Sequence, residues 1–568
     1  MESRTTKAHF ALSHLSPTQD PADTAQMIAQ PEPAGRTDHW PPQVKFIVGN
    51  EACERFSFYG MKSILAGYIG GEIARGGLGQ SPDAATSIIH TFVFAVYFMP
   101  LFGAWLSDRI VGRYHTILWV SLFYCAGHGV LACSDLFHST GAKLSCLFTG
   151  LTLIAFGAGG IKPCVSAFMG DQFTAKQSHL LQKAYGAFYW SINLGSFFSF
   201  LVIPWVKDHH GYGWAFGVPG ILMAVATLIF WLGTKHYVRV PPSRETKSAG
   251  FTKVFATAFT AHSGTKLGPA IHILATIGLP LIAMVAMTFV ALKSDITPFV
   301  RSVGWVALAC VGIWCLLTVL LNLLNRAELP ESFWQSARTR HDAREISAAR
   351  SVAPVLFVFG LIPVFWSLFD QTNSTWVMQG EKMIPFQFLG LKVGAEQMQS
   401  ANPGLVMILV PLMTLWLYPR LGRLASPLKR IGFGLFLTAL SYLLVAALQQ
   451  RIETGSQLSV AWQILPYLVL TTAEVLVSTT GLEFAYRESA PEMKSTIMSF
   501  WLLTVAFGNL LVTTITKVFS DAGSGAHDAS VSSGRFLLYA GLTLVVAVLF
   551  TLVAVRYQDR DPAAAQGK

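Results

Sequence analysis

Charged side chains occupy an apolar stretch of membrane-spanning length near the start of this sequence. The stretch reads VKFIVGNEACERFSFYGMKSILAGYI and carries Glu51, Glu54 and Arg55. Each charge at the centre of a membrane helix costs about 2.5–3.5 kcal/mol on insertion scales, so such side chains usually face a water-filled cavity or one another. At about 100° per residue, one helix face collects all three charges together with Phe58, Tyr59 and Lys62. This polar stripe is typical of a transport pathway, and a static intramembrane ion pair is the alternative.

Lys162 is a lone cation in another apolar stretch, GAGGIKPCVSAFMGDQF. The first and fourth predicted helices run in opposite directions, so Lys162 reaches the same depth as Glu51, Glu54 and Arg55. Cations at this depth would bind a carboxylate, and the two glutamates would hold the cations or take up protons. The alternative is a lysine that snorkels to the headgroups.

Glu474 lies near the middle of a later apolar stretch, LTTAEVLVSTTGLEFAYRES, and Ser478 shares its helix face one turn further on. A buried carboxylate there would suit a substrate ammonium group, or would pair with Lys162 when the pocket is empty. Glu483 falls on roughly the opposite face. We expect it to pair with Arg487 at i,i+4 in a structural role.

Three further ionisable residues are expected at one depth near the outer surface. Lys62 lies in the outer half of the first helix, His90 near the start of the second and Asp370 in the outer half of the seventh. An Asp370–Lys62 pair would close an outer gate, and protonation of Asp370 would weaken it. For His90, a gating role and a purely structural role remain equally open.

Amide and aromatic side chains complete the candidate pocket. Asn193 and Asn402 either bridge helices or bind substrate. Aromatic residues in membrane helices more often serve packing than binding, and the candidates for a pocket wall are Tyr59, Tyr97, Tyr189, Trp366, Phe369 and Trp501.

Composition indicates the kind of protein that positions these residues. The chain has 568 residues, of which 52% are hydrophobic and 13% charged, about half the charged content of soluble domains. This composition predicts an all-α polytopic membrane protein in a lipid bilayer. The net charge of +10 reflects basic cytoplasmic loops, so no nucleic-acid partner is expected. The seven cysteines are scattered without metal-ligand spacing, and we expect no metal, cofactor or disulfide.

Fourteen apolar stretches are long enough to cross a membrane, and they form two groups of six around a pair. The predicted organisation is a cytoplasmic tail over 1–40, a six-helix bundle over 41–240, a linker with two inserted transmembrane helices over 241–350, a second six-helix bundle over 351–558 and a tail over 559–568. The excess of Lys and Arg in alternate loops places both termini in the cytoplasm. The polar, Pro-rich start predicts no cleavable signal peptide.

The loop after the second predicted helix reads GAWLSDRIVGRYHT. It resembles the signature of the major facilitator superfamily, with Asp108, Arg109 and Arg113 able to form a charge relay that locks the cytoplasmic side. An ordinary basic turn is the alternative.

The chain also resembles the proton-dependent oligopeptide transporters, in the bacterial form with two inserted helices. The resemblance runs from Val44 to the end of the last helix and is carried by EACERFSFYG, GGIKPCVSAFMGDQF, FYWSINLGS, FWSLFDQ and EVLVSTTGLEF. It departs at Phe58, where many members have tyrosine, and at Lys62, where arginine is common. Lysine can still pair with Asp370 but lacks the bidentate fork of arginine.

The resemblance implies site residues on both bundles. Arg55, Tyr59 and Lys162 would face the peptide carboxylate. Asn193, Asn402 and Glu474 would face the peptide amino group, and Glu51, Glu54 and Asp370 would be the proton-linked acids. Asn402 is the least secure of these because it stands near the start of its helix.

The function expected from the sequence is a proton-coupled symporter that imports di- and tripeptides by alternating access. A related carrier of another solute, such as nitrate, a drug or an amino-acid derivative, is the alternative. No HExxH, GxSxG or phosphate-binding loop is present, so neither an enzyme nor a receptor is expected. The resemblance further implies a monomer in a bacterial inner membrane.

Overall fold

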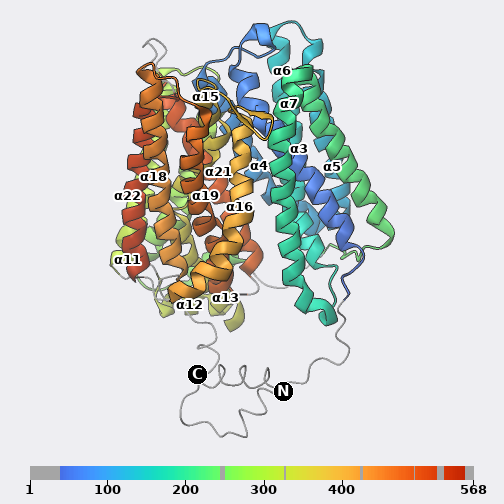
Figure 1. Cartoon of the computed structure of the whole chain (residues 1–568). Coiled ribbons are helices and arrows are strands. Elements are labelled where there is room, and N and C mark those ends of the chain that lie inside the picture. The colour runs from blue at the N-terminus through green and yellow to red at the C-terminus, as the bar shows by residue number, and fades with distance from the viewer. Residues whose placement is uncertain are drawn as a thin grey trace.

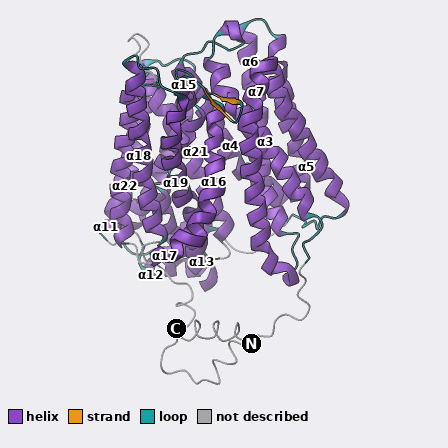
Figure 2. Cartoon of the chain, viewed as in Figure 1, coloured by secondary structure: helices purple, strands orange, loops and turns teal. Residues whose placement is uncertain are grey.

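The computed structural model describes residues 39–242, 250–324, 328–422, 426–490, 493–520 and 530–556. The predicted tails lie outside these ranges, apart from residues 39 and 40. The described chain is helical almost throughout, with one short hairpin of β1 (Phe386–Phe388) and β2 (Leu391–Val393) (Figure 2). A high helix content is expected in a bilayer, because a helix satisfies its own backbone hydrogen bonds.

The first set of helices covers the N-terminal part of the chain. Several begin as the sequence dictates: the Ser81 hydroxyl accepts a hydrogen bond from Ala84 N at 3.2 Å, with proline at the first helical position. At Gly211, with φ 83°, a kink joins two helices that otherwise run on as one. The helices are α3 (Val44–Gly70), α4 (Pro82–Leu106), α5 (Arg113–Ala132), α6 (Thr140–Gly170) and α7 (Ser178–Leu232).

Short and long helices follow between the two sets. Their bounds are α8 (Phe251–Ala261), α9 (Leu267–Ile273), α10 (Leu279–Leu292), α11 (Pro298–Leu323) and α12 (Glu331–Gln335). One π-helical turn, Leu274–Gly278, joins α9 to α10. The long pair α9–α10 and α11 corresponds to the predicted insert.

The second set contains more broken helices than the first. Its members are α13 (Ala343–Phe359), α14 (Pro363–Phe369), η9 (Asp370–Asn373), α15 (Thr375–Gly380), η10 (Gln397–Ser400), α16 (Ala401–Pro411), α17 (Tyr418–Leu421), α18 (Pro427–Glu453), α19 (Ile464–Glu474), α20 (Thr480–Glu488), α21 (Lys494–Val518) and α22 (Ser533–Arg556). A π-helical segment, Val475–Thr479, separates α19 from α20.

Eleven helices among the described residues are long and apolar enough to cross a membrane, or twelve with the pair Ala343–Phe359 and Pro363–Asn373, which is bent by 46°. The kinked stretch Ser178–Lys235 counts once among them. The 27-residue α3 is long enough to cross a membrane but is less apolar than these eleven, because it carries Glu51, Glu54, Arg55 and Lys62. The polytopic helical fold is thus confirmed, whereas the total of fourteen spans stays a prediction.

The helices run between two ends of the molecule (Figure 1). We call the end where α3 begins at Val44 the near end, and the end where α3 finishes at Gly70 the far end. Within the first set, α3 packs against α7, and α5 and α6 pack together; within the second, α18 packs against α22. Contact between α4 and α21 joins the sets.

Glycines allow some of these helices to touch closely. A Cβ at Gly103 of α4 would lie 2.2 Å from the carbonyl oxygen of Gly160 in α6. Only a hydrogen fits there, so the backbones meet in the manner typical of membrane helices.

Candidate functional site

The charged stripe of α3 forms a compact buried cluster. Arg55 Nε lies 2.9 Å from Glu51 Oε1 and 2.5 Å from Glu54 Oε2. The three residues are between 1% and 7% exposed. Two carboxylates therefore share one guanidinium, and the arrangement can hold one negative charge in excess or accept one proton.

Lys162 of α6 joins this cluster from the side. Its Nζ lies 3.7 Å from the centroid of the Tyr97 ring and 5.8 Å from that of Phe58. An ammonium group over an aromatic face is stabilised by the ring quadrupole. Glu51 and Glu54 attract the same ammonium group. The cation is thus held by rings and charges within the bundle.

Glu474 ends α19, where the helix widens into the π-helical segment that holds Ser478. Asn402 of α16 donates a hydrogen bond from Nδ2 to Glu474 Oε2 at 2.7 Å, and contacts Thr471 Oγ1 at 3.1 Å. The alternative partner of Glu474, Lys162, forms no ion pair with it among the described residues, and Asn402 is the partner of Oε2. Such π-bulges occur often at functional sites.

The predicted pairing of Glu483 with Arg487 is wrong. Glu483 Oε2 accepts from Arg430 Nη2 of α18 at 2.8 Å. Arg487 Nε instead lies 3.3 Å from Glu488 Oε1. A partner on a neighbouring helix has displaced the i,i+4 partner, which sequence spacing alone does not reveal.

The aromatic and amide residues predicted to line the pocket differ in exposure and in packing partners. Tyr189 is 39% exposed, and its carbonyl accepts from Asn193 Nδ2 at 3.0 Å, so this amide bonds within α7. Tyr59 packs on Phe200, with centroids 5.8 Å apart. Trp366 packs edge to face on both Phe369 and Trp501.

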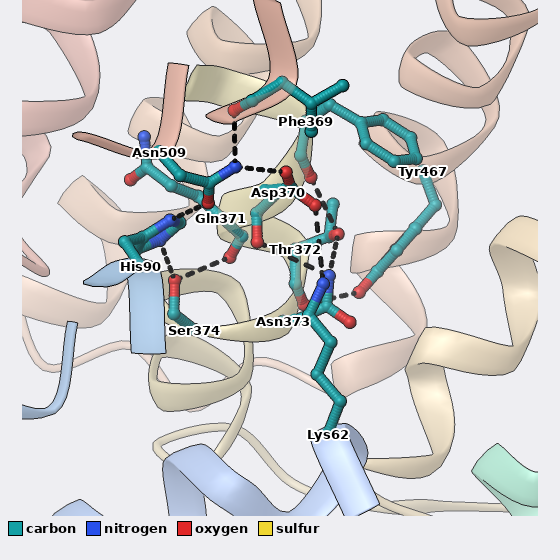
Figure 3. Close-up of polar contacts among 11 residues, drawn as sticks. Lys62, His90, Phe369, Asp370, Gln371, Thr372, Asn373, Ser374, Tyr467 and Asn509 are labelled. Carbon is teal, nitrogen blue, oxygen red and sulfur yellow. Dashed lines mark hydrogen bonds and ion pairs between the residues drawn. The ribbon is translucent and has the colours of Figure 1, made fainter. Parts of the chain in front are cut away.

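A buried hydrogen-bond network links the two sets toward the far end (Figure 3). Lys62 Nζ of α3 lies 3.4 Å from Asp370 Oδ1, and Asn509 of α21 donates to Asp370 Oδ2 at 2.7 Å. His90 of α4 contacts Asn509 Oδ1 at 2.7 Å through Nδ1, and Ser374 Oγ at 2.9 Å through Nε2. Lys62 and His90 thus reach across from the first set to partners in the second.

The partners of His90 define its tautomer. The amide NH₂ of Asn509 donates to Asp370, so its Oδ1 faces His90 and can only accept. His90 Nδ1 must therefore carry the hydrogen, and Nε2 accepts from the Ser374 hydroxyl while the ring is neutral. An added proton on Nε2 reverses only that last bond.

A second contact between the sets lies at the far end and was missed in the sequence. Lys207 of α7 forms an ion pair with Glu396, immediately before η10, and Gln399 Nε2 donates to the Ser63 carbonyl of α3 at 3.0 Å. A Cβ at Gly67 would lie 2.6 Å from Glu396 Oε1. Glycine in α3 therefore makes room for this carboxylate. Glu396 and Lys207 are 189 residues apart in the chain, and no local pattern connects them.

At the near end, the predicted relay has an additional acid. Arg113 Nε lies 3.5 Å from Asp108 Oδ1, and Arg113 Nη1 contacts both oxygens of Asp171, just past α6, at 2.7 and 2.8 Å. The sequence did not assign Asp171. Arg113 therefore ties the end of α6 to the turn after α4. Among the described residues, no group of three or more His, Cys, Asp or Glu could hold a metal ion.

Together these features define the class: a polytopic α-helical membrane protein with the major facilitator fold, two helix sets and charged residues buried between them. The chain belongs to the POT family, whose model matches residues 114–530. A crystal structure of an auto-inhibited POT family peptide transporter is 40% identical, with a TM-score of 0.76, over 92% of this chain and 98% of that one. The in meso crystal structure of the POT family transporter PepTSo is 37% identical, also with a TM-score of 0.76, over 92% and 99%.

The curated relatives are longer. Peptide transporter 3 of Caenorhabditis elegans is 33% identical over 425 residues, which is 73% of this chain and 51% of the relative. The chain spans about half the length of the curated relatives it matches.

Proposed function

We propose that this chain is a proton-coupled symporter that imports di- and tripeptides by alternating access. The family supports transport of peptides with protons, as its fuller name, proton dependent oligopeptide, indicates. The residues that we propose for binding and proton coupling are the predicted site residues described above, on both helix sets.

One observation carries the substrate class. The first set carries the cations Arg55 and Lys162, and the second carries the carboxylate of Glu474. Arg55 and Glu474 are both close enough to the Tyr59 hydroxyl to act on it electrostatically, which supports a shared pocket. A peptide has a carboxylate at one end and an ammonium group at the other, and opposite charges on opposing bundles match that zwitterion. Asn402 holds the carboxylate of Glu474 in place until an ammonium group competes for it.

The far-end contacts support alternating access. Lys62–Asp370, the His90 bonds and Glu396–Lys207 all join the two sets at or toward this end. If these contacts break, the far end can open. We assign the far end to the outer side of the membrane. The near end would then be cytoplasmic, with both termini, and the carrier would act as a monomer in a bacterial inner membrane.

Uptake by reconstituted carrier tests the proposal. The full chain is placed in liposomes, an inward-directed pH gradient is imposed, and accumulation of a labelled dipeptide is followed. We expect accumulation above the external concentration, and its loss when the gradient is collapsed. Lys162→Ala should abolish gradient-driven uptake while the protein still inserts, because Lys162 balances the acids of α3. Its matched control is Lys183→Ala, an exposed lysine on α7.

The same vesicles distinguish peptide transport from transport of another solute. Nitrate lacks the positive charge of a peptide and an uncharged drug lacks both terminal charges, so neither should compete with the dipeptide. Gradient-driven uptake of such a solute with no uptake of dipeptide would refute peptide transport.

A further inference from the structure

A cavity of about 900 Å³ lies near the far end, outside the charged site. Its walls come from α4 and α6 of the first set, from the end of α21 in the second set, and from the end of α10 with the turn that follows it. It is therefore a junction of three parts of the molecule. Its size is within the range of small-molecule sites, about 300–1,000 Å³.

The lining changes from apolar to polar toward the far end. Phe92 of α4 and Ala155 and Phe156 of α6 line the deeper part. Lys293 and Lys517 line the part at the ends of α10 and α21, opposite Asp83. An apolar channel below a polar, positively charged mouth is complementary to an acyl chain below an anionic headgroup.

The cavity is entered from the bilayer. Phe148 and Leu292 stand at its edge and are 51% and 73% exposed. In a membrane-spanning part of the molecule, large exposed apolar side chains face lipid. An occupant that enters between them must be soluble in the bilayer.

Polar groups at the mouth are held in place. Lys517 Nζ donates to the carbonyls of Val290, Ala291 and Lys293 at 3.1, 2.8 and 2.6 Å, and so caps α10. Asp83 Oδ1 accepts from Ser530 N at 2.5 Å. Ser87 is one of the lining residues, but its Oγ is turned away from the cavity surface and is fully buried.

We propose that this cavity binds an anionic phospholipid of the far-end leaflet. Its phosphate lies against the ammonium group of Lys293, with the positive charge of Lys517 close by, and one acyl chain runs down between α4 and α6. The inserted helix α10 has a function in this arrangement: it supplies the wall that closes the lipid site against α21.

Native mass spectrometry of the delipidated full chain tests the site. The probes are palmitoyl-oleoyl phosphatidylglycerol, the matching phosphatidylethanolamine and inorganic phosphate. We expect retention of the phosphatidylglycerol in preference to the ethanolamine lipid, and none of inorganic phosphate. Ala155→Phe and Ala95→Phe fill the channel from two different helices and should each weaken lipid binding about tenfold, or about 1.4 kcal/mol. Lys293→Gln should remove the preference for the anionic headgroup.

A matched control fills no cavity. Leu228 lies on the exposed face of α7 and is 52% exposed. The Leu228→Phe variant should bind lipid as the unmodified chain does. Retained affinity in both filling variants, with elution as a folded monodisperse protein, would overturn the site. Binding of inorganic phosphate alone, or equal retention of both lipids, would overturn the headgroup assignment.

Discussion

At the residue scale, the carboxylate of Glu474 is the group whose chemistry most directly reports substrate class. Its Oε2 accepts a hydrogen bond from the uncharged amide of Asn402, and no cation pairs with it among the described residues. An ammonium group can form a charge-assisted bond with the ionised carboxylate, worth about 1.5–3 kcal/mol.

Replacing Glu474 with Gln should therefore remove uptake of dipeptides with a free amino group, by about tenfold or more. Amino-blocked analogues should lose much less, since they never carried the ammonium charge. Competition by the two substrate types in liposomes measures the difference. Glu483→Gln makes the same chemical change at the surface partner of Arg430 and should leave both substrates unaffected. Equal loss for both substrates in Glu474→Gln would instead assign Glu474 to coupling or structure.

Several residues of the candidate site were accessible from sequence because burying a charge in a membrane helix is costly. Glu51, Glu54, Arg55 and Lys62 were found this way. The apolar stretch that carries them runs from Val44 to Ile69, and the structure has a helix over Val44–Gly70. Their functional roles remain predictions.

Neutral partners and distant pairs carried no such signal. Asn509 is a single amide in the apolar run AFGNLLVTT, and nothing in its neighbours links it to His90. Local spacing favoured Arg487 for Glu483, whereas packing of α18 against α20 supplied Arg430. The bend between α13 and α14 falls between Gly360 and Pro363, and this proline is a local signal that the prediction of one continuous helix did not use. The π-helical segment after Glu474 has no such local signal.

At the element scale, α3 and the broken helix α14–η9 are joined by Lys62 and Asp370. At an effective dielectric of ~20, a pair ~4 Å apart is worth about 4 kcal/mol before desolvation is subtracted. A net effect of ~1.4 kcal/mol would still move the equilibrium between conformations about tenfold.

Asp370→Asn should shift the carrier toward a conformation open at the far end, and should uncouple uptake from the proton gradient while peptide exchange persists. Double electron–electron resonance between labels at Ile73 and Lys382, both exposed near the far ends of α3 and α15, should show a longer distance population. Asp295→Asn, in the exposed turn after α10, is the matched control. An unchanged distribution with normal accumulation would exclude Asp370 as gate and as proton site.

The contact between α7 and the start of η10 gives a pH dependence of its own. Burial raises the pKa of Glu396 from 4.5 to about 7, against the opposing attraction of the Lys207 ammonium group. A carboxyl whose pKa is higher in the folded state binds its proton more tightly there. Its contribution to stability is therefore fully present below about pH 4.5 and is lost as the pH rises through about 7.

Glu396→Gln keeps the neutral form at every pH and should abolish this dependence. The melting temperature of the unmodified protein in detergent, minus that of the variant, should be larger at pH 5 than at pH 8. The change amounts to on the order of 3 kcal/mol in the free energy of unfolding. Glu72→Gln alters an exposed carboxylate near the same end and should show no such trend. A constant difference across this range would contradict the assignment to Glu396.

At the scale of the whole molecule, the sidedness of the ends decides which gate meets the acidic compartment. Cys133 follows α5 at the far end and is exposed. In intact cells it should react with a membrane-impermeant maleimide added outside, and the Cys133→Ser variant should not be labelled. Labelling that requires inside-out vesicles would reverse the proposed orientation.

Lys517 ties α10 to α21, and Arg301 Nη2 of α11 donates to the Ser520 carbonyl at 2.6 Å. The inserted pair is therefore fastened to the second set at the same end by two cations on backbone carbonyls, and must tilt with it. A fluorophore in the short α10–α11 turn, 293–297, would consequently change its orientation whenever the second set tilts. It would report each rocking step of single carriers from a position that neither peptide nor proton has to pass.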